Sequence, residues 1–272
     1  MSLVTTKSGV HLFVKDWGEG PPIVLIHGWP LSSDTFDDLG MAVANAGFRA
    51  IAYDRRGFGR SDQPWDGYDY DTLSDDLAVV VEHAGGKDVA LLGFSMGGGE
   101  VARYLSRHDG QGVTRVILVS SVVPYMLKTS DNPAGVEHSV FDQMTQGIQH
   151  DRAHFWPSFF RQFYGAGVLS HLVSDEVIRW SCDLAMMASL KGTLDCVHAF
   201  AATDFRPDLK SFTMPTLVIH GTADKTVPID TSARQAARAI PRSVSLEYDG
   251  APHGLFASHK TRLAQDVLKF LS

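Results

Sequence analysis

A serine nucleophile is the first chemistry that this sequence could support, at Ser95 in a Gly-x-Ser-x-Gly pattern. The pattern, Gly93-Phe94-Ser95-Met96-Gly97, follows an apolar run and precedes a glycine-rich segment that we expect to be helical. A serine on such a turn has a strained backbone, and side chains two positions before and after it would collide with neighbouring backbone. The pattern alone arises by chance, but its place between strand and helix favours a nucleophile over a glycine-rich helix start.

The residues that could activate this serine are Asp224 and His253. A serine hydroxyl is a weak nucleophile until a base takes its proton, and a carboxylate orients and stabilises the imidazole that does so. Asp224 follows the apolar run 216–220, and His253 follows the run 244–248. Both therefore lie just past a predicted strand, and the chain order serine, aspartate, histidine is that of the α/β-hydrolase arrangement. We predict a triad of Ser95, Asp224 and His253.

Three other titratable residues fit the triad less well because of where they lie. His220 falls within a predicted strand, and His259 falls within the final predicted helix. Asp249 is too near His253 in the sequence to be its usual acid. These residues are the weaker alternatives for base and acid.

The segment His27-Gly28-Trp29-Pro30 follows the apolar run 23–26 and lies where an oxyanion hole is needed. We predict that the backbone N–H groups of Trp29 and Met96 donate to the tetrahedral oxyanion. Pro30 has no N–H and a restricted φ, so it stiffens the loop without donating. His27 is more typical of a structural histidine that bonds the loop than of an acid or base.

The elements that must position these residues follow an alternating pattern. Short β-rich runs alternate with amphipathic helical segments, which indicates a mostly parallel sheet with helices on both faces. The run from Val10 to Asp16 alternates like an edge strand. Asp71 is a plausible N-cap for the helix expected at 72–83. The expected strands are 10–16, 23–26, 49–53, 89–94, 115–121, 216–220 and 244–248, and the expected helices are 34–46, 72–83, 96–107, 231–240 and 255–271.

After Pro124 the alternation stops for roughly 85 residues. No convincing strand occurs there, and aromatic residues cluster between Phe155 and Tyr164, which is typical of a helical insertion. The alternation resumes at Pro215, so the insertion interrupts one sheet domain. We expect an α/β core at 1–123 and 211–272, with a helical cap at 124–210.

Composition excludes several classes of protein. The chain has 272 residues, 44% of them hydrophobic, which can fill a sizeable core and excludes a disordered chain. Its formal net charge of −7 makes nucleic acid an improbable partner. No run reaches about 18 apolar residues, and the N-terminal segment lacks the features of a signal peptide. We therefore expect a cytoplasmic protein that does not enter a membrane.

The candidate metal ligands and cysteines are too few to form a site. His150 and His154 could face one side of a helix, but no third ligand and no His-Glu-x-x-His pattern accompanies them. Cys182 and Cys196 show no metal-type pairing, and we expect free, largely buried thiols. The sequence therefore predicts no cofactor, no metal and no disulfide scaffold.

The polar loop 54–62 contains three arginines, which could bind an anion. Arg55 and Arg56 lie beside Asp54 and Asp62 in the sequence, so structural ion pairs that support the active-site loops are the better interpretation.

Together these motifs resemble the α/β-hydrolase superfamily over nearly the whole chain. The resemblance is to the cofactor-free haloperoxidase, or perhydrolase, and aryl-esterase branch. It rests on His27-Gly28-Trp29-Pro30 and on the segments 54–61, 93–104 and 224–228, and the run Met-Gly-Gly-Gly-Glu-Val-Ala-Arg-Tyr within 96–104 is specific to that branch. Haloalkane dehalogenases and epoxide hydrolases carry aspartate at the position of Ser95, so the serine argues against both chemistries.

This resemblance implies an eight-stranded α/β-hydrolase fold and a metal-free ester hydrolase that forms an acyl-enzyme. It also implies that hydrogen peroxide can replace water, so that a short carboxylic acid gives a peracid that oxidises halide. Pro30 after the oxyanion tryptophan is similar to the perhydrolase-leaning members. The branch further implies a homo-oligomer, as a trimer, hexamer or dimer. A lactonase or amidase with the same triad, or a ligand sensor that does not turn over, are the alternatives.

Aromatic residues of the predicted cap are mostly core, but some should line a small apolar acyl pocket over Ser95. We expect this pocket to contain residues from both the core and the cap, namely Pro30, Phe94, Val122, Phe141, Trp156, Phe159, Phe163, Phe200 and Val227.

Overall fold

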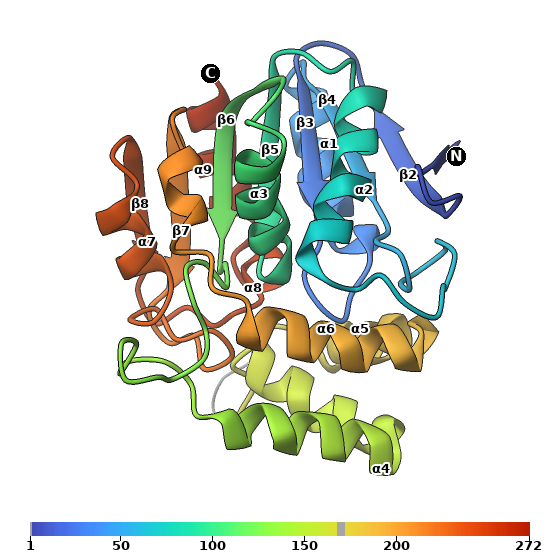
Figure 1. Cartoon of the computed structure of the whole chain (residues 1–272), viewed down its shortest axis with the longest axis vertical. Helices are drawn as coiled ribbons and strands as arrows, with labels where there is room; N and C mark the ends of the chain where they lie inside the picture. Colours follow the sequence, from blue (N-terminus) through green and yellow to red (C-terminus); the bar gives the residue numbers. More distant parts are fainter. Residues whose placement is uncertain (1, 168–171) are drawn as a thin grey trace.

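One mixed sheet forms the centre of the molecule. The computed structural model describes residues 2–167 and 172–272. Its eight strands lie in the order β1-β2-β4-β3-β5-β6-β7-β8; β1 and β2 pair antiparallel with their neighbours up to β4, and the other pairs are parallel. Figure 1 shows the sheet with β2 near one side and β8 at the other. This confirms the predicted α/β class. The strands are β1 (Ser2–Thr5), β2 (His11–Trp17), β3 (Pro22–Ile26), β4 (Arg49–Tyr53), β5 (Val89–Phe94), β6 (Val113–Val119), β7 (Thr216–Gly221) and β8 (Ser243–Tyr248).

Helices cover both faces of the sheet, and this explains the uninterrupted apolar runs in its central strands. Helices α1 (Asp37–Asn45) and α9 (Lys260–Leu271) pack against each other on one face, and α2 (Tyr70–His83) and α3 (Met96–Arg107) on the other (Figure 1). Helix α7 (Ala233–Ala239) contacts β7 and β8. Strands β5 and β7 are buried along their whole length, as expected where no face meets water.

The edge of the sheet differs from the prediction. We expected the run from Val10 to Asp16 at the edge, but β2 lies between β1 and β4, and β1 is the edge strand. The four residues of β1 alternate between half-buried and exposed. We did not predict this strand because an alternating pattern over four residues is too short to separate a strand from an irregular terminal segment.

Three helix boundaries also differ. Asp69 caps α2, because its side chain accepts the Thr72 N–H, and the expected cap Asp71 lies in the first turn. The first helix begins with a 3-10 turn, η1 (Ser33–Phe36). The expected closing helix is two helices, α8 (Leu255–Ser258) and α9, because His259 has φ −134° and ψ 31°.

The segment between β6 and β7 supplies three helices that lie across the carboxyl ends of the strands (Figure 1). They are α4 (His138–Phe163), α5 (Asp175–Met187) and α6 (Leu190–Ala202), followed by the short helix η2 (Asp208–Ser211). Helix α4 is kinked at Asp151, whose φ of −160° and ψ of 92° are not helical. No helix in the described ranges is long and apolar enough to cross a membrane.

The contact between α3 and β3 depends on a glycine and gives a first prediction. A Cβ on Gly97 would lie 2.4 Å from the backbone oxygen of Ile26, and backbone cannot move aside cheaply. We expect Gly97→Ala to lower the free energy of unfolding by about 1–3 kcal/mol, although alanine favours the helix by about 1 kcal/mol. Urea denaturation measures this change.

Gly167→Ala is the control for that substitution, because, its chain neighbours aside, no atom of the described residues lies within 4 Å of a Cβ at Gly167. Its effect should stay within about 0.5 kcal/mol. A Gly97 variant as stable as the Gly167 variant would show that the helix is free to move away from β3.

Candidate active site

Ser95 lies on a strained turn at the junction of β5 and α3. Its φ is 53° and its ψ is −119°, a conformation that a residue other than glycine adopts only when its surroundings impose it. Hydrogen bonds on both sides hold the turn: the Ser95 N–H donates to Val119 O at 2.9 Å, and Ser95 O accepts the N–H groups of Gly98 and Val122. The hydroxyl is thereby presented at the carboxyl end of the sheet.

The structure brings Ser95, His253 and Asp224 into one hydrogen-bonded chain. The Ser95 hydroxyl lies 2.9 Å from His253 Nε2, and His253 Nδ1 lies 2.6 Å from Asp224 Oδ2. Because a carboxylate only accepts, Nδ1 carries the proton, and Nε2 is left to accept from the hydroxyl. Ser95 and Asp224 are each 6% exposed and His253 is 1% exposed. This is the geometry that general-base activation of a serine requires.

The Asp224 carboxylate is saturated with donors. Oδ1 accepts the N–H groups of Thr226 and Val227 at 2.9 and 2.8 Å, while Oδ2 faces His253. Burial by itself would raise the pKa of Asp224, but the imidazoles of His253 and His220 outweigh it and hold that pKa well below its usual range. Asp224 is therefore ionised at neutral pH, as a group that stabilises an imidazolium must be.

Two aromatic residues that we expected on the pocket wall lie instead against the His253 ring. The rings of Phe94 and Phe163 lie 5.1 and 4.7 Å from that of His253, between centroids. The Phe163 carbonyl also accepts the Gly254 N–H at 3.0 Å. The last turn of α4 thus contacts the predicted base directly.

The predicted oxyanion donors lie beside Ser95. Trp29 and Met96 both line the cavity above the serine. In the part of the chain that the structure describes, the backbone N–H of neither residue donates to a protein acceptor. The Trp29–Pro30 peptide bond is cis, and the Trp29 indole donates to Thr193 O at 3.0 Å. Both amides are therefore available to a charged oxygen, as an oxyanion hole requires.

A buried arginine joins the oxyanion loop to the helix that follows Ser95. The Arg55 guanidinium donates to His27 O at 2.6 Å and to Glu100 Oε1 at 2.6 Å, and Tyr53 donates to Glu100 Oε2 at 2.7 Å. Arg55 is 1% exposed, and Glu100 is fully buried. Because Glu100 belongs to α3, one ion pair holds the loop that contains Trp29 against the helix that begins at Met96.

His27 has a structural environment, in agreement with its predicted structural role. Its Nδ1 lies 2.9 Å from Gly28 O, and its Nε2 accepts the Arg55 N–H at 2.9 Å. Burial first, and the Arg55 charge second, lower the pKa of His27 to about 3. The imidazole is thus neutral and already bonded through both nitrogens.

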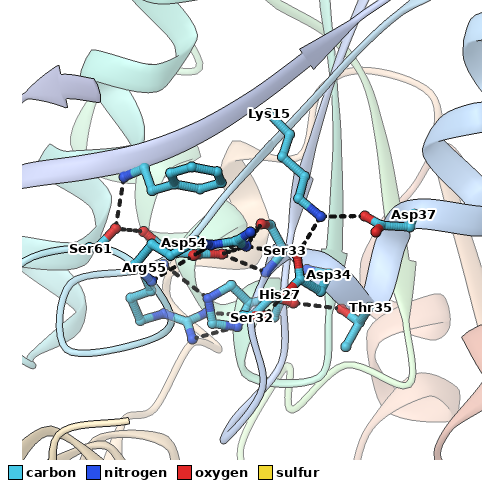
Figure 2. A network of polar contacts seen from close by, with 12 residues as sticks. Lys15, His27, Ser32, Ser33, Asp34, Thr35, Asp37, Asp54, Arg55 and Ser61 are labelled. Carbon is cyan, nitrogen blue, oxygen red and sulfur yellow. Dashed lines mark hydrogen bonds and ion pairs between the residues drawn. The ribbon is translucent and has the colours of Figure 1, made fainter. Parts of the chain in front are cut away.

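Arg55 and Arg56 form ion pairs, but not with the carboxylates that sequence proximity suggested. Arg55 pairs with Glu100, and Arg56 pairs with Asp76 of α2. Asp54 instead accepts from Ser33 and Arg60, within the network that Figure 2 shows around the start of the loop. Asp62 accepts from the backbone and ring of His11. The partners of Arg55 and Arg56 thus come from α3 and α2, and only Arg60 pairs with a carboxylate of its own loop among these three arginines.

A cavity of about 500 Å³ opens above Ser95. Helix α4, α6, the segment after β6 and the loop after β7 form its walls, and five of the expected pocket residues line it: Val122, Phe141, Phe159, Phe200 and Val227. The walls also contain residues that sequence reasoning missed, including Met126, Met144, Phe155 and Lys225. Periodicity shows that a helix has an apolar face but not which turn of that face meets a cavity.

Two other expected wall residues, Trp156 and Pro30, are buried and do not line the cavity. Trp156 packs edge-on against Trp29, 5.4 Å between centroids. It therefore supports the side chain of a residue that does line the cavity.

The histidine pair and the cysteines form no metal site in the described ranges. No group of three potential ligands occurs there, and His154 lines the cavity while His150 does not. Cys182 and Cys196 are free, and burial raises the pKa of Cys196 to about 12. A thiol with such a pKa is a poor nucleophile at neutral pH.

Comparison with known proteins agrees with this geometry. A family model described as the alpha/beta hydrolase fold matches residues 21–260. The chain is 42% identical to a non-heme chloroperoxidase of Kitasatospora aureofaciens, with both chains covered completely. It is 39% identical to a bifunctional esterase/perhydrolase of Acinetobacter calcoaceticus, over 100% of this chain and 99% of the relative. A solved bromoperoxidase from Bacillus anthracis matches with a TM-score of 0.96 at 42% identity, over 99% of each chain.

The buried ion pair gives a second prediction. Arg55→Met removes the partner of a fully buried carboxylate, so we expect the free energy of unfolding to fall by about 3–5 kcal/mol. Combining it with Glu100→Met should recover part of that loss, because no unpaired charge then stays buried. Guanidinium denaturation measures both changes.

The exposed pair of Arg179 and Glu176 is the matched control, with side chains 69% and 73% exposed. Arg179→Met should cost less than about 1 kcal/mol. If Arg55→Met costs no more than Arg179→Met, Arg55 does not stabilise the loop.

Proposed function

Because the chain belongs to the alpha/beta-hydrolase family, in its non-heme haloperoxidase and perhydrolase branch, we propose that it is a serine esterase of small acyl and aryl esters that also accepts hydrogen peroxide. The observation that carries this proposal is the hydrogen-bonded chain from Ser95 through His253 to Asp224 at the base of a largely apolar cavity. A protein that only bound esters would need neither an activated hydroxyl nor free amides beside it.

In the acylation step, Ser95 Oγ attacks the ester carbonyl carbon while its proton passes to His253 Nε2. The Asp224 carboxylate stabilises the imidazolium, and the Trp29 and Met96 amides donate to the developing oxyanion. The bond to the alcohol oxygen then breaks, and that oxygen takes the proton from His253. The products are a free alcohol and an acyl group bound to Ser95. When a carboxylic acid takes the place of the ester, its C–OH bond breaks instead, and the hydroxyl leaves as water with the proton from His253.

In the second step, water or hydrogen peroxide attacks the acyl carbon and gives its proton to His253. The bond to Ser95 Oγ breaks, and Oγ takes the proton back. Water yields a carboxylic acid, and peroxide yields a peracid, which oxidises bromide to hypobromous acid and is itself reduced to the carboxylic acid. No metal or redox cofactor takes part in this proposal.

Two features support the use of peroxide. The relative from Acinetobacter calcoaceticus is an esterase and a perhydrolase in one protein, at 39% identity over the whole chain. Pro30 directly follows Trp29 in the sequence, and a proline at this place is similar to the perhydrolase-leaning members of the branch. We propose that this loop favours peroxide as the acceptor of the acyl group.

The partners in this proposal are a small ester or carboxylic acid and hydrogen peroxide. Neither a nucleic acid nor a membrane partner is part of it. We also propose that the protein is a cytoplasmic homo-oligomer, because the resemblance to this branch implies a trimer, hexamer or dimer. Light scattering of the purified protein measures the number of subunits.

The proposal predicts turnover of p-nitrophenyl acetate that depends on Ser95. Ser95→Ala should lower kcat at least about 1000-fold, because the nucleophile is lost while the folded cavity is kept. Bromination of a phenol in the presence of acetate, peroxide and bromide should fall in parallel. A Ser95→Ala variant that brominates at the wild-type rate would contradict the perhydrolase mechanism.

The cavity wall predicts the acyl preference. Phe200 lines the cavity and packs edge-on against Trp29, so Phe200→Ala enlarges the space near the predicted oxyanion hole. The longer acyl chain can then bury apolar surface in the space that the ring occupied. We therefore expect the ratio of kcat/KM for p-nitrophenyl octanoate over acetate to rise about tenfold or more.

Val244→Ala is the control for the Phe200 variant, because Val244 is an exposed residue of β8 outside the cavity. It should leave the octanoate-to-acetate ratio unchanged. Equal ratios in the two variants would exclude Phe200 from the acyl pocket.

A further inference from the structure

A second buried imidazole lies beside the Asp224 carboxylate. His220 is the fifth residue of β7 and is 1% exposed. Its Nε2 lies 2.8 Å from Val227 O and 3.1 Å from Asp224 Oδ2. Both oxygens only accept hydrogen bonds, so Nε2 must carry the proton. The N–H bond is directed at the Val227 carbonyl and lies close to the same carboxylate oxygen that His253 contacts.

Both backbone polar groups of Val227 are hydrogen-bonded in this arrangement. Its N–H donates to Asp224 Oδ1 at 2.8 Å, and its C=O accepts from His220 Nε2. The side chain of Val227 lines the cavity above Ser95. One imidazole therefore connects the strand β7 to the loop that carries both the predicted acid and part of the cavity wall.

The second ring nitrogen of His220, Nδ1, makes no contact with the described residues that would require a histidine at this position. Its Nδ1 is buried and has no hydrogen-bond partner in the described ranges. Its neighbour in β8 is Glu247, whose carboxylate is bound by Arg234. Burying an unpartnered ring nitrogen costs free energy that an aliphatic side chain would not incur. The contacts of Nε2 are thus what the imidazole contributes.

We propose that His220 is a positioning residue for the triad, which holds the loop 224–227 so that Asp224 Oδ2 stays aligned with His253 Nδ1. This inference rests on the proposed function of the triad. His220 reaches neither Ser95 nor the cavity and acts only through Asp224 and Val227. Without its N–H, the Val227 carbonyl loses its buried donor, and the loop can shift the carboxylate away from the imidazole. A small displacement of this kind costs a large factor in rate.

The test compares His220→Leu with His220→Gln. Leucine removes the donor, whereas the glutamine amide N–H can reach the place of Nε2. Each variant is treated with diethyl p-nitrophenyl phosphate, which transfers its diethyl phosphoryl group to the activated serine and releases p-nitrophenol. The amplitude counts folded active sites, and the rate constant reports the activation of Ser95, whatever the natural ester is.

We expect His220→Leu to slow phosphorylation of Ser95 and to lower kcat for p-nitrophenyl acetate per titrated site, each by about tenfold or more, with KM changed less than twofold. His220→Gln should recover most of both rates. Ile219→Val, a buried change in the same strand, should leave the rates unchanged and controls for altered packing of β7.

Equal rates per titrated site in His220→Leu and the wild type would overturn the proposal, as would a folded His220→Gln variant no faster than the leucine variant. Failure of the proposed function has a different signature: the wild-type protein itself would then react with neither the phosphate nor the acetate ester.

Discussion

The strained backbone of Ser95 dictates how the elements around it are arranged. A conformation with positive φ costs about 1–3 kcal/mol for a residue with a side chain, and it persists because several hydrogen bonds impose it. The carbonyl of Val119 accepts the Ser95 N–H, and the amides of Gly98 and Val122 hold the Ser95 carbonyl. The turn therefore requires that β6 lies beside β5 and that α3 begins at the residue directly after Ser95. The small residues around it follow from the same requirement, since α3 must approach β3 closely.

Buried charge connects this turn to the rest of the site. The Arg55–Glu100 pair lies between the oxyanion loop and α3, so the two predicted oxyanion donors are held by one interaction. On the other side of Ser95, the Asp224 carboxylate is surrounded by amide and imidazole N–H groups. In both places the charged groups have partners, so burial strengthens the interactions instead of expelling the charges. The site is thereby organised before a substrate arrives, which is what electrostatic stabilisation of a transition state requires.

The helices between β6 and β7 do more than close the cavity. Phe163 of α4 packs against the His253 ring and binds the Gly254 amide, while Trp156 and Phe159 pack on Trp29. The predicted base and the loop that contains Trp29 thus both contact α4 directly. A displacement of α4 would therefore change both the position of the His253 ring and the shape of the cavity above Ser95, because the same helix contacts both.

We could predict the alternating elements, the mostly parallel sheet and the candidates for nucleophile, acid and base from the order of the residues. These features are local: an apolar run, a glycine pattern and a position just past a strand can each be recognised within a few residues. The partners of the side chains, in contrast, became known only from the folded arrangement. Arg55 pairs with Glu100, 45 residues away, and not with its neighbour Asp54; β1 takes the edge of the sheet; and Phe94 and Phe163 support His253 and do not line the cavity.

His220, which sequence reasoning set aside because it lies in a strand, lies against Asp224 because the turn after β7 brings the chain back on itself. The physical reason is that side-chain partners are chosen by distance and direction in the folded molecule, and neither is encoded by spacing along the chain.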